Sequence, residues 1–158
     1  MRRPDVLRLS KLTDYGTVVL AHLADLDDDL ASAAKVAAVT RIAPPTVRKL
    51  LKALGKADLV TSTRGSQGGY RLARQASKIS AADVIDALEG PVAITECSSD
   101  HSMCDFESIC TVGGAWQRIN IAIRGALTDI SLADLLRSNR PVPRFNFAGT
   151  PVIVETKH

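Results

Sequence analysis

A short amphipathic segment places the strongest limit on how this chain can fold. Residues 44–56 begin with Pro44-Pro45, which suits the first turn of a helix because the first amide groups there lack a partner inside the helix. Apolar residues then recur at helical spacing: Val47, Leu50, Leu51 and Leu54. The pattern predicts a helix with one buried face and one basic face.

The segments on either side complete a recognisable arrangement. Residues 33–39 are expected to form a shorter helix, joined to the helix at 44–56 by a tight turn. After that helix, residues 59–63 and 70–72 are β-prone and enclose a glycine-rich turn, which predicts a hairpin. Two helices joined by a tight turn and followed by a hairpin are typical of a winged helix-turn-helix, whose second helix enters the major groove of DNA.

The rest of the chain is expected to be helical until its tail. Ser10 is placed to cap a helix to about Asp25, and capping boxes start further helices at Ser80 and Ser131. Gly113-Gly114 leads into a long helix at about 115–127, and the tail from Arg140 is expected to be irregular. The fold class is therefore mainly α. Its expected parts are a winged helix-turn-helix at 8–90, a cysteine loop at 91–113, a long dimerisation helix with a short following helix at 114–138, and a tail at 139–158.

Charge divides the chain into two halves. Residues 1–80 carry a formal charge of +7 and residues 81–158 carry −4, and between Lys35 and Lys78 there are ten basic residues and a single acid, Asp58. A basic block of this kind favours a polyanionic partner, although a solvated helix face has the same composition. No apolar run reaches the roughly 18 residues of a membrane span. The sequence therefore predicts double-stranded DNA as the partner, with no membrane association.

Candidate DNA contacts follow from the expected winged helix. Its recognition helix begins with the residues that usually meet base edges, namely Pro45, Thr46, Arg48 and Lys49. Arg48 is the best placed to read guanine. Lys52, Arg64 and Arg71 are expected to contact phosphates. Gly68-Gly69 in the wing would let the backbone approach phosphates closely, or would form an ordinary turn.

The long helix carries a second apolar pattern. Trp116, Ile119 and Ile123 recur at close to the a/d spacing of a coiled coil, which predicts a seam for another helix. A second copy of the chain is the expected partner, since a symmetric dimer matches a palindromic operator. Packing on the chain's own domain is the alternative.

All three cysteines lie in one short stretch. Six residues separate Cys97 from Cys104, and five separate Cys104 from Cys110. Three soft ligands in one loop indicate a metal or an iron–sulphur cluster. Zinc is an alternative, although these spacings differ from the close pairs of most zinc sites, and plain thiols acting as a redox or nitrosation sensor are another. His101 or a loop carboxylate would be the fourth ligand. An odd number of cysteines favours reduced thiols and a cytoplasmic location.

Taken together, these motifs resemble the IscR/NsrR-type regulators of bacteria. The resemblance rests on the winged helix, on a wing reading Arg64-Gly65-Ser66-Gln67-Gly68-Gly69-Tyr70-Arg71-Leu72, and on three cysteines before a long helix. It covers about residues 8–138. The opening Leu9-Ser10-Lys11-Leu12-Thr13-Asp14-Tyr15-Gly16 is similar to the branch that regulates the SUF iron–sulphur assembly system.

The resemblance implies a ligand set. Cys97, Cys104 and Cys110 match the three cluster cysteines of the family. The IscR type has a histidine three residues after its last cysteine, where this chain has Gly113. The NsrR type uses an aspartate of the first helix, reached from the other subunit, and Asp14 matches it. The implied cofactor is a 4Fe–4S or 2Fe–2S cluster. A structural role for Asp14, as a first-turn acid favoured by the helix dipole, is the alternative.

The expected function is a cluster-dependent transcriptional regulator of iron–sulphur assembly genes, not an enzyme. A nitric-oxide-sensing repressor of the same fold and a zinc or thiol sensor are the alternatives. A small metalloenzyme or electron carrier would use the same cluster, but the basic wing and the lack of a second cofactor motif stand against it.

Overall fold

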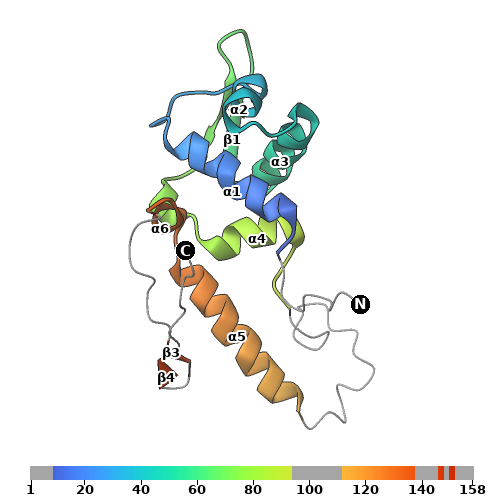
Figure 1. The fold of residues 1–158 in the computed structure, drawn as a ribbon, viewed down its shortest axis with the longest axis vertical. Coiled ribbons are helices and arrows are strands. Elements are labelled where there is room, and N and C mark those ends of the chain that lie inside the picture. Colours follow the sequence, from blue (N-terminus) through green and yellow to red (C-terminus); the bar gives the residue numbers. More distant parts are fainter. Residues whose placement is uncertain (1–8, 94–111, 138–145, 148–149, 152–158) are drawn as a thin grey trace.

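The computed structural model describes residues 9–93, 112–137, 146–147 and 150–151. Most described elements gather into one helical head, and a long helix, α5, extends away from it (Figure 1). The class predicted from the sequence, mainly helical with a small antiparallel sheet, is confirmed. No helix among the described residues is long and apolar enough to cross a membrane.

Three helices form the centre of the head: α1 (Lys11–Ala24), α2 (Ala33–Thr40) and α3 (Pro44–Lys56). Ser10 and Ser32 cap the first two by accepting backbone amide hydrogens, and Pro44 opens the third. The four apolar residues predicted to form the buried face of α3 are at most 1% exposed. They pack in one core with α1 residues such as Leu20, so the helical stripe read from the sequence determines how α3 docks.

The wing is a two-stranded antiparallel hairpin of β1 (Val60–Thr63) and β2 (Gly69–Leu72). Val60 lies opposite Leu72 at its base. A single residue between α1 and α2 extends this sheet: the amide of Ala31 donates to the carbonyl of Tyr70 (3.0 Å), and the amide of Tyr70 donates back to Ala31 (2.8 Å). The wing is thereby attached to the helical core, a contact that the local sequence does not predict.

A single 3₁₀ turn, η1 (Ala76–Lys78), leads from the wing into α4 (Ala81–Glu89). The capping box predicted at Ser80 is present, with reciprocal bonds between Ser80 and Asp83. Val84 and Ile85 are buried, and α4 packs against both α1 and α3. Gly90 ends the helix with a φ of 91°, a conformation that a residue with a side chain adopts only with strain.

The long helix α5 (Gly113–Asp129) extends two residues beyond its predicted range at each end. Its first turn contains Gly113-Gly114, which the sequence placed before the helix. The short helix α6 (Leu132–Leu136) follows, and the predicted capping box at Ser131 and Asp134 is present. Leu132 is fully buried in the core of the head, so α6 returns the chain to it.

The tail is not wholly irregular, and the sequence prediction was wrong on this point. Two short strands, β3 (Asn146–Phe147) and β4 (Thr150–Pro151), pair antiparallel. Each strand has two residues, too few for period-two alternation to be visible in the sequence.

Candidate nucleic-acid interface and cluster site

The helix-turn-helix is formed by α2 and α3. Arg41, which ends α2, adopts a left-handed conformation (φ 58°), and this turns the chain into α3 within three residues. The buried face of α3 leaves the opposite face open, so Pro45, Arg48, Lys49 and Lys52 are exposed as predicted for DNA contacts. Thr46 is half-buried. Arg48, Lys49 and Lys52 thus present three positive charges along the exposed side of α3, from its second turn to its third.

The wing adds charge next to this helix. Arg64 lies in the turn of the hairpin and Arg71 on β2, opposite Thr61, and both are exposed. Tyr70 and Leu72 alternate with Arg71 and pack against the core instead. Arg74, just beyond the wing, has a different role, because its guanidinium pairs with Asp83 at 3.1 Å. The charge of these residues does not show that Arg71 is free to meet DNA whereas Arg74 forms an ion pair with α4.

The two wing glycines are required by close packing of the backbone. A Cβ on Gly69 would lie 2.8 Å from the carbonyl carbon and oxygen of Ala31. A Cβ on Gly68 would lie 2.9 Å from the carbonyl carbon of Arg64 and 3.0 Å from the oxygen of Gly65. All of these distances are shorter than van der Waals contact. The glycines therefore allow the wing to fold tightly and to dock on the core. This is a stricter requirement for glycine than an ordinary turn would impose.

One exposed basic residue was missed by the sequence reasoning. Arg41 is exposed at the turn between α2 and α3, and its basic character at a helix junction was the signal available. Because it lies three residues before Pro44, where the recognition helix begins, it joins the candidate phosphate contacts.

Cys97, Cys104 and Cys110 lie outside the described residues. Within the described part of the chain, no group of three or more His, Cys, Asp or Glu residues could hold a metal. The remaining predicted ligand, Asp14, lies in the first turn of α1 and is exposed. It lines a mainly apolar surface groove of about 470 Å³ between α1, α4 and the end of α5. Its carboxylate is therefore accessible to a ligand approaching from outside the head.

A second carboxylate connects this turn of α1 with the end of α4. Glu89 Oε1 accepts hydrogen bonds from the amide of Ser10 (2.8 Å) and from the Thr13 hydroxyl. The bond from Thr13 is the main cause of a lowered pKa for Glu89; desolvation opposes it and the Ser10 amide adds to it. The chain leaves α4 one residue later, at Gly90, toward the cysteines. The start of the cysteine segment and Asp14 thus lie at the same end of the head.

The predicted dimer seam is partly open. Trp116 is 40% exposed and Ile119 42%, whereas Ile123 is half-buried. Ile121, which is not part of the predicted seam, is 69% exposed. Asn120, eight residues into α5, is the one buried residue of this helix, which the structure describes in full, and Ile123, Ala126 and Leu127 beyond it are half-buried. The C-terminal half of α5 is thus partly covered where it packs on α4, whereas the N-terminal half leaves apolar side chains exposed.

The fold and the basic surface define a winged helix-turn-helix DNA-binding protein. Residues 9–138 match the Rrf2 family, described as iron-dependent transcriptional regulators, and the chain belongs to this family. It is therefore a DNA-binding transcriptional regulator and not an enzyme.

Solved structures agree with this assignment. CymR, the global cysteine regulator of B. subtilis, is 29% identical with a TM-score of 0.64, and the match covers 85% of this chain and 99% of CymR. IscR of T. potens is 30% identical with a TM-score of 0.62, over 85% of this chain and 89% of IscR. A transcriptional regulator from Listeria innocua is 27% identical with a TM-score of 0.65, over 89% and 93% of the two chains.

Proposed function

We propose that this chain is an iron–sulphur cluster-dependent transcriptional regulator of SUF iron–sulphur assembly genes, which binds a palindromic operator as a homodimer. The observation that carries the proposal is the position of Asp14. An exposed carboxylate lies at the end of the head from which the cysteine segment departs. Similarity to IscR of T. potens supports the same class of cofactor.

The proposed ligands are Cys97, Cys104 and Cys110 of one subunit and Asp14 of the other, so that the site is completed across the dimer. Three thiolates and one carboxylate suit iron, and the Asp14 side chain is exposed, as a ligand shared between subunits must be. When bound, the cluster would supply a centre sensitive to oxidation, nitric oxide and iron supply. A carboxylate binds iron more weakly than a thiolate, so this ligand set favours a labile site.

The head provides a route from this site to DNA. Glu89 fixes the first turn of α1 to the end of α4. Two residues beyond Asp14, a Cβ on Gly16 would lie 3.6 Å from Leu50 of the recognition helix, so α1 and α3 are in close contact. A displacement of the first turn of α1 would therefore shift α3. We expect operator affinity to depend on whether Asp14 and the three cysteines hold the cluster.

The test begins with protein purified without oxygen. Its absorbance and its iron and sulphide content are measured, and its affinity for its own promoter is compared before and after cluster removal. The proposal requires bound iron and sulphide and a difference in affinity. Colourless, iron-free protein that binds at full strength would contradict it.

Asp14→Ala tests the fourth ligand, with Asp29→Ala as a matched control in an exposed acid beyond the other end of α1. We expect Asp14→Ala to change the absorbance or shorten the lifetime of the cluster in air, and Asp29→Ala to leave both unchanged. An unaltered spectrum and lifetime in Asp14→Ala would show that another group completes the site.

A metal-free thiol sensor is the second candidate, because a cysteine regulator, CymR, has the same fold. In that case the protein would contain no iron, and oxidation of its thiols alone would change its affinity for DNA.

A further inference from the structure

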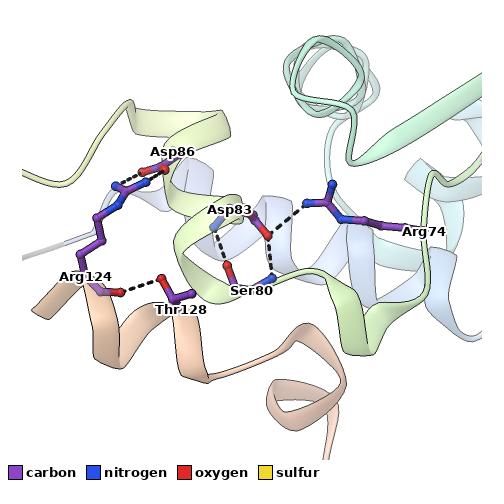
Figure 2. A network of polar contacts seen from close by, with 6 residues as sticks. All are labelled: Arg74, Ser80, Asp83, Asp86, Arg124 and Thr128. Carbon is purple, nitrogen blue, oxygen red and sulfur yellow. Dashed lines mark hydrogen bonds and ion pairs between the residues drawn. The ribbon is translucent and has the colours of Figure 1, made fainter. Parts of the chain in front are cut away.

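Helix α4 is held on two sides by arginine–carboxylate pairs, shown in Figure 2. Toward the wing, Arg74 Nη2 lies 3.1 Å from Asp83 Oδ2. Toward the long helix, Arg124 binds Asp86 through both oxygens, with Nη2 to Oδ2 at 2.5 Å and Nη1 to Oδ1 at 3.1 Å. The two acids are three residues apart on α4, so one turn of this helix connects the wing with α5.

The first pair makes α4 a rigid part of the DNA-binding head. Asp83 Oδ2 also accepts the Ser80 amide at 2.9 Å, and Arg74 Nε donates to the carbonyl of Lys78 at 3.0 Å. Burial raises the pKa of Asp83, but the bonds from Ser80 and the charge of Arg74 outweigh it and lower that pKa. With Val84 and Ile85 buried against the core, α4 is fixed relative to the wing and the recognition helix.

Helix α5 packs along α4, and two sets of hydrogen bonds join it to this head. At its C-terminal end, the amide of Ala81 donates to Ile130 (2.8 Å) and the amide of Leu132 donates to Ile79 (2.7 Å). We call this pair of backbone bonds the pivot. The second attachment is the Arg124–Asp86 pair, six residues or about 9 Å along the helix from Ile130.

The N-terminal part of α5 extends away from the described part of the head (Figure 1). Residues 114–119 are all exposed. A helix held at one end by a pivot can change its angle unless a second contact prevents it, and the bidentate Arg124–Asp86 pair has the geometry of such a contact.

We propose that Asp86 and Arg124 set the angle between α5 and the head, and that this angle determines which spacing of two DNA half-sites the dimer prefers. The inference rests on the dimer of the proposed function, in which α5 joins the two heads. Seventeen helical residues span about 25 Å, so a change of about 10° at the pivot moves the far end by about 4 Å. One base-pair step is about 3.4 Å, so a small change of angle shifts the register between the heads by a whole step.

The experiment measures spacing preference. A half-site is selected from random-sequence duplexes with the wild-type protein and is placed in duplexes that hold one copy, or two copies at a series of spacings. Wild-type protein, Asp86→Asn, Arg124→Gln and the charge-exchanged double variant Asp86→Arg/Arg124→Asp are compared. Arg137→Gln is the matched control, since its pair with Asp134 at 3.9 Å stays within one short stretch of the chain.

We expect the two single variants to keep wild-type affinity for one half-site. The ratio of their affinities for the best spacing and for the neighbouring spacings should fall by up to about fivefold. That figure corresponds to the usual strength of a partly exposed pair. The exchanged variant should regain part of the discrimination, and Arg137→Gln should match the wild type. Unaffected single-site binding also shows that each variant is folded.

Two results would overturn the proposal. If the wild-type protein prefers one spacing and the single variants prefer it equally, the pair does not set the angle, and the inference alone is wrong. If the wild-type protein itself prefers no spacing, the dimeric binding of the proposed function is wrong, and this inference is wrong with it.

Discussion

Replacing Gly69 by alanine should destabilise the head and displace the wing. The added Cβ would lie 2.8 Å from the carbonyl carbon and oxygen of Ala31 and 3.0 Å from its nitrogen. All three are backbone atoms, which cannot rotate away as a side chain can. The clash is relieved only if β2 moves away from Ala31, and that movement lengthens the two hydrogen bonds between Ala31 and Tyr70.

The magnitude follows from two opposing effects. Overpacking at a closely packed position costs about 1–3 kcal/mol, and each of the two hydrogen bonds at risk contributes about 1 kcal/mol. Replacing glycine by alanine also restricts the unfolded chain, which offsets less than about 1 kcal/mol. We therefore expect a net loss of about 2–4 kcal/mol in the free energy of unfolding. For a chain of 158 residues this lowers the Tm by about 4–16 °C.

The assay is thermal unfolding at a fixed protein concentration, with operator binding measured in parallel. Gly55→Ala in α3 is the matched control, because its Cβ would meet the Val60 oxygen at an ordinary 3.7 Å. Glycine within a helix costs about 0.5–1 kcal/mol relative to alanine, so this control should raise the Tm slightly. A Gly69→Ala protein with an unchanged or higher Tm and wild-type DNA affinity would refute the argument that Ala31 requires glycine here.

Two further predictions concern pH and salt. The lowered pKa of Glu89 means that its carboxylate stabilises the fold above its ordinary pKa of 4.5, and that this contribution is lost as the pH falls below that value. Glu89→Gln should therefore flatten the acid side of the curve of Tm against pH, and a curve parallel to the wild type would contradict the role of the Thr13 bond. In DNA binding, Lys52→Ala should reduce the slope of the logarithm of the binding constant against the logarithm of the salt concentration by about one, because one phosphate contact is lost. Arg48→Ala should mainly weaken the discrimination in favour of guanine, by about 1–3 kcal/mol. Lys78→Ala, in the 3₁₀ turn that packs on α6, should change neither quantity, and an equal effect of all three variants would show that net charge alone drives binding.

The local elements could be predicted from the sequence because their signals are local. Serine caps, the Pro44-Pro45 start and the three- and four-residue apolar spacing act within one or two helical turns, and the observed boundaries of α1 to α4 agree with them within about two residues. The order of these elements was enough to predict a winged helix-turn-helix. Where a signal was weak or short, as at Gly113-Gly114 and in the two-residue strands of the tail, the prediction missed.

The sequence by itself determined which segments become helices, which faces they bury and where positive charge gathers, because these properties depend on neighbouring residues. Only the tertiary structure decided that Gly69 lies against Ala31. It also decided that Glu89 accepts a hydrogen bond from Thr13, 76 residues away in the sequence, and that Asp86 pairs with Arg124, 38 residues away. Several arginines and acids of the chain have the same pairing chemistry, and composition does not choose among them. The choice is made when the helices pack, since packing brings particular side chains within hydrogen-bonding distance and keeps the others apart.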